Sequence, residues 1–314
     1  MNDLKGKRVL ITGAAGFIGS NLARKLLETG AEVHGIVRES TDLWRLAGID
    51  SSLALHETDL QDFKKVKKII TKVNPQLVFN AAMPHGHPKL EQQKDYLTNS
   101  LLSTANILEA LSATEYDCLI HLGSSLEYSS DNKPFKESDR TEPTTFRGVT
   151  KTATSLLCEH YIKSRNNPIV ILRLFSVYGY FEHFSRLIPT AIKATLSNKT
   201  MDLTKLGYSR DLIFIDDVVE ACLVASQTKK AIGETINVGS GKQWKNEEVI
   251  DQIQAVLGQK IKVNIGSYPK SPSDKSYWAA DTAKAKRLLR WEPRYSLQEG
   301  LKKTVAWFEK YQGV

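Results

Sequence analysis

Residues 8–19 read RVLITGAAGFIG, in which a short apolar run leads directly into a turn that contains three glycines. The run is partly β-branched and carries no charge after Arg8, which is typical of a buried parallel strand. Residues 21–28 then repeat apolar side chains with helical spacing, and Gly30 supplies a helix stop. The sequence therefore predicts a strand, a tight turn and a helix in immediate succession.

Such a junction is a binding site for an anion, because the unpaired amides at the start of the helix point toward a phosphate. Gly13 would allow the tight turn, Gly16 would let a pyrophosphate approach the backbone, and Gly19 would let the helix pack closely on the strand. We therefore expect a nicotinamide dinucleotide to bind here. The predicted cofactor contacts in this turn are Gly13, Ala15, Gly16, Phe17, Ile18 and Gly19.

The first half of the chain repeats this alternation of strand and helix. Further strands are predicted at residues 32–37, 53–56, 75–82, 118–122 and 169–174. Helices are predicted between them at residues 62–73, 91–111 and 150–164. Regular alternation of this kind requires a parallel sheet with helices on both faces.

The regular alternation of strand and helix ends at about residue 175. Beyond it the sequence predicts helices near 188–197 and 246–257 and short strands at 212–215 and 235–238. We predict an α/β fold, with a Rossmann-type doubly wound parallel sheet and a smaller C-terminal substrate-binding lobe. The dinucleotide-binding domain is predicted over residues 1–175, with returning segments at about 208–240. Residues 176–314 are predicted to form mainly the substrate-binding lobe.

Composition narrows the class of protein. The 314 residues are 41% hydrophobic and carry a net charge of +8, and no apolar run approaches the roughly 18 residues that a membrane span needs. The lysines at 64, 65, 67 and 68 alternate with apolar residues, which indicates a solvated helix face rather than a nucleic-acid site. We expect a cytoplasmic protein with reduced cysteines, without nucleic-acid or membrane partners and without a metal site. A mildly basic chain also suits an anionic small substrate such as a nucleotide sugar.

The end of the second predicted strand bears on the choice of cofactor. An acid at this point accepts a hydrogen bond from the ribose of NAD, whereas an arginine favours the 2′-phosphate of NADP. The sequence has Arg38 here and Glu39 one position later, so it favours NADP and leaves NAD open. Other predicted cofactor contacts follow the third and fourth strands, at Asp59, Leu60, Ala81 and Ala82.

Several motifs along the chain resemble those of the extended short-chain dehydrogenase/reductases. They are the glycine turn, Asn80-Ala81-Ala82, SSLEY at 124–128, LRLFSVYG at 172–179, SRDLIFIDDV at 209–218, Asn237-Val238-Gly239 and Trp291-Glu292-Pro293. The resemblance covers nearly the whole chain in the right order. It implies an enzyme of the nucleotide-sugar epimerase, dehydratase and ketoreductase group, with a nucleotide sugar as substrate.

In the resembled family a serine, a tyrosine and a lysine carry the chemistry by general acid–base catalysis coupled to hydride transfer. Ser124 matches the serine and Lys151 matches the lysine, which also holds the nicotinamide ribose. Arg147 stands four residues before Lys151, where the resemblance requires the tyrosine. A guanidinium offers only donors and has no accessible base form, so it cannot exchange a proton as a phenol does.

Four explanations of Arg147 are open. Another group exchanges the proton, for which the candidates are Tyr128, Tyr178 and the pair His85 and His87. Alternatively the chemistry has changed, and Arg147 stabilises an enolate or a carboxylate electrostatically. The protein would otherwise be a binding relative with weak catalysis, or the residue was introduced by engineering.

The resemblance also implies contacts with substrate and with a partner subunit. Arg210 would bind the nucleotide pyrophosphate through its planar fork of donors, and Arg186 and Ser125 lie where further substrate contacts fall. The loop after the sixth strand, with Tyr178, would line the sugar pocket. The two long helices at 91–111 and 150–164 would pair with those of a second copy in a four-helix homodimer contact.

Overall fold

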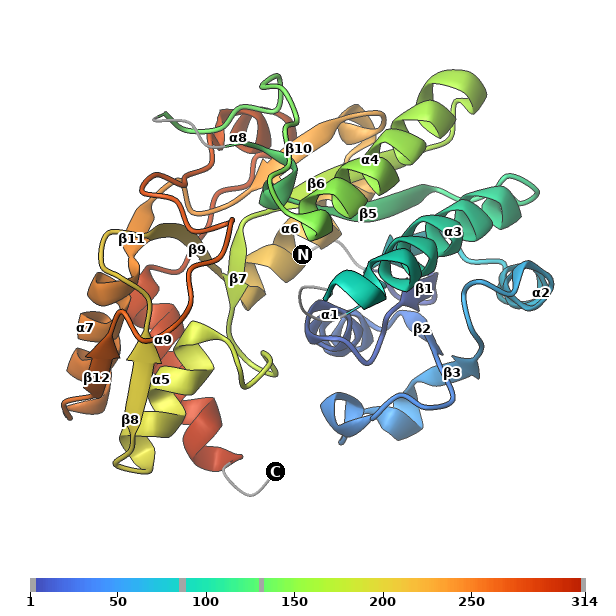
Figure 1. Ribbon diagram of the computed structural model, residues 1–314. Coiled ribbons are helices and arrows are strands. Elements are labelled where there is room, and N and C mark those ends of the chain that lie inside the picture. The colour runs from blue at the N-terminus through green and yellow to red at the C-terminus, as the bar shows by residue number, and fades with distance from the viewer. Residues whose placement is uncertain (1–3, 85–88, 130–132, 312–314) are drawn as a thin grey trace.

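A parallel sheet of seven strands forms the larger part of the molecule in the computed structural model, which describes residues 4–84, 89–129 and 133–311 (Figure 1). The strand order is β10-β6-β5-β4-β1-β2-β3, and every neighbouring pair is parallel. The strands are β1 (Arg8–Thr12), β2 (Glu32–Val37), β3 (Ala54–Glu57), β4 (Leu77–Asn80), β5 (Cys118–Ser124), β6 (Ile169–Leu174) and β10 (Thr235–Val238). The predicted fold class is confirmed.

Helices cover both faces of this sheet, because successive residues of a strand point to opposite sides. Val9 and Ile11 of β1 join a core with α1 and α6, whereas Leu10 joins a second core with α2, α3 and α4. Figure 1 shows α3 and α4 lying side by side across one face. These helices are α1 (Phe17–Glu28), α2 (Phe63–Val73), α3 (Gln93–Leu111), α4 (Phe146–Arg165) and α6 (Ile215–Gln227).

The strand order reverses beside β1, which lies between β2 and β4. Chain connections run from β1 toward β3 on one side and from β4 toward β10 on the other. Ligands of doubly wound sheets bind outside the carboxyl ends of the strands at such a reversal. The glycine turn follows β1 directly, so the fold places it at this point.

The rest of the chain builds the smaller lobe, which Figure 1 shows to one side of the large sheet. Its strands are β7 (Ser176–Tyr178), β9 (Ser209–Phe214) and β11 (Gln243–Lys245) in one sheet, and β8 (Thr200–Leu203) and β12 (Lys262–Ile265) in another. Its helices are α5 (Leu187–Leu196), α7 (Asn246–Leu257) and α9 (Leu297–Lys310), whereas α8 (Ala283–Leu289) packs beside β10 and α6 of the large sheet. Short 3-10 helices connect elements elsewhere in the chain. They are η1 (Trp44–Leu46), η2 (Asp50–Ser52), η3 (Leu90–Gln92), η4 (Ser125–Glu127) and η5 (Lys229–Ala231).

Several predicted elements differ in extent from those observed, for example the strand predicted at 75–82, which spans Leu77–Asn80, and two of the differences have a clear structural cause. The helix predicted from residue 150 begins at Phe146, because the Thr145 hydroxyl accepts a hydrogen bond from the Gly148 amide at 3.0 Å and caps the helix earlier. The strand predicted at 212–215 begins at Ser209, and Ile215 already opens α6. Within the predicted return at about 208–240, α6 and β10 pack on or join the large sheet, whereas β9 belongs to the small one. None of the described helices is long and apolar enough to cross a membrane.

Candidate functional site

The glycine turn has the geometry of a phosphate cradle. Gly13 has a φ of +68°, and a Cβ there would lie 2.8 Å from the Ala82 Cα. A Cβ on Gly19 would lie 2.2 Å from the Gly13 carbonyl oxygen, so helix α1 could not approach the turn. Gly16 is the N-cap of α1 and has no capping side chain, which leaves the first amides of the helix to a ligand. The residues present therefore fit a dinucleotide pyrophosphate.

Neighbouring strand ends meet this turn. The Thr12 hydroxyl donates to the Asn80 side chain at 2.8 Å and accepts from the Ala82 amide at 3.3 Å. This pair of bonds holds the Ala81-Ala82 segment against Gly13. The structure thus brings together the predicted cofactor contacts that follow β1 and β4.

The predicted ribose contacts lie at the ends of β2 and β3. Arg38 directly follows β2 and is exposed, and its amide donates to the Thr41 hydroxyl at 3.2 Å. The Thr58 amide donates to the Val37 carbonyl at 2.9 Å, which brings Asp59 to the same edge as Arg38. The next residue, Leu60, is buried. Arg38 and Asp59 therefore lie just beyond the ends of two neighbouring strands, and the Arg38 side chain is exposed.

Ser124 and Lys151, the two predicted catalytic residues that match the resembled family, lie close to the end of β5. Ser124 ends β5, its hydroxyl accepts from the Leu126 amide at 3.1 Å, and its own amide donates to the Glu127 carboxylate at 2.7 Å. Lys151 is buried on α4, and its Nζ donates to the Leu122 carbonyl at 2.5 Å. Burial, aided by the nearby Arg147 charge, lowers the pKa of Lys151 to about 8. Both side chains thus lie at the carboxyl edge of β5.

Arg147 lies in the first turn of α4, as the spacing to Lys151 predicts. Burial lowers its pKa, and the Arg186 charge acts in the same direction, while the Tyr96 phenol opposes both. Tyr96 of α3 is itself buried and meets the Phe146 ring edge-on, with ring centroids 6.5 Å apart. The structure therefore places Arg147 between the large sheet and the lobe, near Tyr96 and within electrostatic reach of Arg186.

Two tyrosines considered as proton donors are placed differently. Tyr128 donates to the Asn237 side chain at 2.8 Å and accepts from Arg173 at 3.0 Å. Burial raises the pKa of Tyr128 to about 12. Because Arg173 also pairs with the buried Glu127 at 2.9 Å, this phenol belongs to a structural network that supports β5. We expect no proton exchange from it near neutral pH.

Tyr178 packs inside the lobe. Its hydroxyl donates to the Leu297 carbonyl at 3.3 Å, and its side chain is 1% exposed. A Cβ on Gly300 would come within 2.1 Å of the same hydroxyl, so α9 covers it closely. Burial raises the pKa of Tyr178. The Tyr178 hydroxyl is thus covered by α9, and the histidines 85 and 87 lie outside the described residues.

Glu182 is a buried acid beside the predicted substrate residue Arg186, and the sequence analysis did not single it out. It lies between β7 and α5, is 5% exposed, and its Oε2 has no hydrogen-bond partner among the described residues. Its Oε1 lies 3.6 Å from the Arg186 Nε. Burial raises the pKa of Glu182 to about 7, against the opposing effect of Arg186. Only the placement of this acid beside a predicted substrate arginine could have drawn attention to it, and its burial depends on contacts from other segments.

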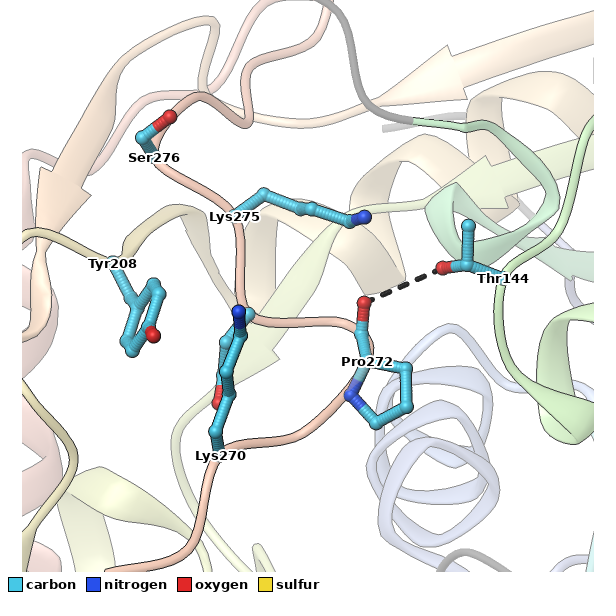
Figure 2. Close-up of a pocket in the computed structure, with 7 residues that line it drawn as sticks. Thr144, Tyr208, Lys270, Pro272, Lys275 and Ser276 are labelled. Atoms are coloured by element: carbon cyan, nitrogen blue, oxygen red, sulfur yellow. Dashed lines mark hydrogen bonds between the residues drawn. The ribbon is translucent and has the colours of Figure 1, made fainter.

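A pocket opens in the lobe beside the start of α4. Its volume is about 460 Å³, and much of its lining comes from the loop between β12 and α8 (Figure 2). Lys275 extends toward Thr144, whose hydroxyl donates to the Pro272 carbonyl at 3.4 Å. The lining residues are Thr144, Tyr208, Lys270, Pro272, Asp274, Lys275 and Ser276.

Arg210 pairs with the buried Asp274, which is one of these lining residues. Burial lowers the pKa of Arg210, the Asp274 charge opposes this, and the Arg186 charge adds to it. Ser125 is buried and accepts a hydrogen bond from the Trp278 indole at 3.1 Å. The predicted substrate arginines therefore come within electrostatic reach of each other, while Ser125 is engaged by the lobe. Among the described residues, no three His, Cys, Asp or Glu side chains gather as metal ligands would.

Comparison with known proteins finds relatives that match nearly the whole chain. A family model described as GDP-mannose 4,6-dehydratase matches residues 10–304. A UDP-glucuronate 4-epimerase from Thermodesulfobacterium geofontis is 30% identical over 311 residues, which cover 95% of each chain.

Solved structures agree. The epimerase Mth375 from Methanothermobacter thermautotrophicus superposes with a TM-score of 0.91 at 28% identity, covering 98% of this chain and 94% of that one. The UDP-glucuronic acid 4-epimerase from Bacillus cereus, solved with UDP-glucuronic acid and NAD, superposes with a TM-score of 0.88 at 29% identity over 96% and 99%. The chain therefore belongs to the GDP-mannose 4,6-dehydratase family of extended short-chain dehydrogenase/reductases, as its motifs indicated.

Proposed function

We propose that this chain is an NAD(P)-linked enzyme, with NADP favoured and NAD possible, that acts on carbon 4 of a nucleotide-activated sugar and so epimerises, dehydrates or reduces it. The observation that carries the proposal is the meeting of the glycine turn, Ser124 and Lys151 at one edge of a parallel sheet. The matched family and the relatives support the position on the sugar, because 4-epimerases and 4,6-dehydratases share chemistry at carbon 4.

The chain's own residues would bind and orient the reactants. The Ser124 hydroxyl would donate a hydrogen bond to the oxygen on carbon 4, and the Lys151 ammonium would hold the nicotinamide ribose. With a pKa of about 8, Lys151 is mostly protonated at neutral pH and serves there as a cation. A bound nicotinamide would supply hydride exchange with carbon 4. As the carbonyl forms, the proton of the sugar hydroxyl must pass to a base.

Two residues are candidates for the base that accepts the proton of the sugar hydroxyl. His85 stays a predicted candidate. Glu182 is a second one, because a carboxyl with a pKa of about 7 can both accept and return a proton near neutral pH. Its Oε2, which has no hydrogen-bond partner within the described part of the chain, and its position beside Arg186 support this choice.

The nucleotide and its diphosphate would occupy the pocket in the lobe. Arg210 and Arg186 would take the phosphate oxygens through planar forks, and Lys270 and Lys275 would add positive charge at the rim. In this arrangement the sugar points from the pocket toward Ser124.

The choice of NADP rests on Arg38, which is exposed directly after β2. Arg38→Gln should weaken NADP binding by about 10-fold and leave NAD binding unchanged, since one charge-assisted contact to the 2′-phosphate is lost. Titration of the cofactors against protein fluorescence measures both, and Glu39→Gln is the matched control. Equal loss for the two cofactors would argue for a different role of Arg38.

Turnover of nucleotide sugars tests the proposal as a whole. The protein is incubated with both oxidised and reduced cofactor and a panel of UDP-, dTDP- and GDP-sugars, and sugar mass and nicotinamide absorbance are followed. Conversion by the wild type supports the proposal. An inactive wild type whose Arg147→Tyr variant becomes active would contradict it.

That second result would favour another function, in which the chain binds the dinucleotide structurally or as a sensor. The observation behind this alternative is Arg147 itself, because a guanidinium cannot exchange protons as a phenol does.

We also propose a cytoplasmic homodimer that pairs through α3 and α4. Leu102 on α3 and Leu156 and Val149 on α4 are 40%, 55% and 44% exposed. Residues 149 and 156 are seven positions apart and so share one helix face. An apolar face of this kind on two adjacent helices suits a four-helix contact. The three cysteines are free and buried, which supports a reducing compartment.

A further inference from the structure

A row of polar side chains crosses the large sheet toward the carboxyl ends of its central strands. Thr12 of β1 is the register partner of Asn80 on β4, and Asn80 is the register partner of His121 on β5. Register partners in neighbouring parallel strands project to the same face, which here is the face that α4 covers. Thr154 of α4 meets the end of the row. These four buried side chains, Thr12, Asn80, His121 and Thr154, form what we call the polar chain.

The polar chain lies next to a row that is wholly apolar. Two residues earlier in the same three strands, the register partners on this face belong to one buried apolar cluster, and they are Leu10, Val78 and Leu119. The sheet therefore packs against its helices through apolar side chains in one layer and changes to hydrogen-bonding groups in the next layer toward the glycine turn. Because buried polar groups cost free energy unless they are paired, this change indicates a role that apolar side chains would not fill.

Hydrogen bonds join the polar chain to the cofactor turn at one end. The Ala82 amide donates to the Thr12 hydroxyl at 3.3 Å, and this hydroxyl donates its own proton to the Asn80 Oδ1 at 2.8 Å. The Asn80 Nδ2 lies 3.2 Å from the His121 Nδ1. Because an amide nitrogen can only donate, the Nδ1 of His121 accepts and the ring proton is on Nε2.

At its other end the polar chain reaches Lys151. The His121 Nε2 donates to the Thr154 hydroxyl oxygen at 3.2 Å, and the Thr154 hydroxyl donates to the Lys151 carbonyl at 2.9 Å. The Lys151 Nζ donates to the carbonyl of Leu122, the residue after His121. Two successive residues of β5 therefore hold Lys151, one through its backbone carbonyl and the other through its ammonium.

His121 is a neutral member of the polar chain. Burial, aided by the Lys151 charge, lowers the pKa of His121 to about 3. The ring therefore keeps one donor and one acceptor near neutral pH, and the hydrogen bonds run in one direction from Ala82 to Lys151. Such a chain fixes geometry and does not supply a proton.

We propose that His121 is a positioning residue, which through the polar chain sets Lys151 relative to the glycine turn. The two ends of the chain are groups that must meet the same cofactor, because the turn would bind the pyrophosphate and the Lys151 ammonium would reach the nicotinamide ribose. The link between them fixes the span that a dinucleotide has to match. This inference rests on the proposed function, in which Lys151 holds that ribose.

A double-mutant cycle on Thr154 and Lys151 tests whether the polar chain acts through the lysine. Thr154→Val keeps the shape of the side chain and removes the hydroxyl, and Lys151→Met removes the ammonium. Isothermal titration gives the dissociation constant of NADP or NAD, whichever the wild type binds more tightly, for all four proteins of the cycle. Thr154→Val should weaken binding by about 3- to 10-fold in the wild type, which is the worth of one hydrogen bond, and should have no further effect in the Lys151→Met protein.

ADP separates this effect from a general loss of structure. It carries the adenosine and the pyrophosphate but no nicotinamide ribose, so its affinity should stay unchanged in every variant. Thr154→Ser keeps the hydroxyl and should restore dinucleotide affinity, and His121→Phe should give the same cycle as Thr154→Val. Thr304→Val is the matched control, because this buried hydroxyl donates to the Gly300 carbonyl of its own helix at 2.7 Å. It should bind both ligands as the wild type does.

The outcomes separate this inference from the function on which it rests. Equal losses from Thr154→Val with and without the Lys151 ammonium overturn the inference, and so does an equal loss of ADP affinity, because the polar chain would then stabilise the fold without placing Lys151. Unchanged dinucleotide affinity in Thr154→Val overturns it as well. In each of these cases the proposed function stands if Lys151→Met weakens dinucleotide binding. If Lys151→Met binds the dinucleotide as tightly as the wild type, Lys151 does not hold the ribose, and the proposed function and the inference both fall.

Discussion

Glu182→Gln should remove a pH-dependent loss of stability that the wild-type protein carries. The Glu182 carboxyl is buried, one oxygen has no hydrogen-bond partner among the described residues, and the half-exposed Arg186 lies 3.6 Å from the other. Burial raises its pKa from 4.5 to about 7. Between these values the folded protein holds a proton that the unfolded chain has released, so the free energy of unfolding falls as pH rises.

The size of the effect follows from the two pKa values. A difference of about 2.5 units, at 1.36 kcal/mol per unit, corresponds to roughly 3 kcal/mol. This contribution is fully present below pH 4.5 and is lost as pH rises through 7. Glutamine has no proton to lose, so the variant should gain roughly 3 kcal/mol relative to wild type between pH 5 and pH 8.

Urea denaturation followed by tryptophan fluorescence at pH 5 and pH 8 measures this difference. Glu309→Gln, on an exposed position of α9, is the matched control and should keep the pH dependence of the wild type. If the stability difference between wild type and Glu182→Gln is the same at both pH values, the Glu182 carboxyl does not have the raised pKa that its burial predicts.

Other predictions concern the cofactor site, the core and the partner surface. Gly19→Ala places a Cβ 2.2 Å from the Gly13 oxygen and should abolish dinucleotide binding in a fluorescence titration. Unchanged affinity would show that the glycine turn does not bind the pyrophosphate. Glu127→Gln leaves the buried Arg173 charge without its carboxylate and should lower the free energy of unfolding in urea by about 3–5 kcal/mol. If the loss of unfolding free energy is smaller than that caused by breaking an exposed ion pair, Glu127 does not stabilise the buried Arg173 charge. Leu156→Lys should convert the homodimer to a monomer in light scattering, and a wild-type monomer would refute the α3–α4 contact.

The order of the elements could be predicted because each one leaves a local signal. Val9, Leu10 and Ile11 are apolar whichever face of the sheet they point to, and Gly13 and Gly30 mark the turns that separate strand from helix. The predicted ends of the helices were less accurate than the predicted order of the elements. The cap at Thr145, which starts α4 one turn early, is a single hydroxyl within a stretch that reads as a loop.

The roles within the site were harder to predict, because they depend on contacts between distant segments. Tyr128 follows Ser124 closely in sequence and was a reasonable proton donor, yet Arg173 and Asn237 enclose its hydroxyl from two other strands. Glu182 carried no signal, since its burial and raised pKa arise only when the lobe folds around it. Arg147, Arg186 and Arg210 likewise belong to three separate elements, and their proximity cannot be read from net charge.

The most direct test of the central claim is the fate of the hydrogen on carbon 4. A nucleotide sugar labelled with deuterium at that carbon is mixed with protein and oxidised cofactor, and the cofactor and sugar are analysed by mass spectrometry after a single turnover. The account predicts that deuterium leaves carbon 4 for the nicotinamide in an otherwise unmodified protein that retains Arg147. If the sugar is converted while its deuterium never reaches the nicotinamide, or if sugars of every class are bound and returned unchanged, the account is contradicted.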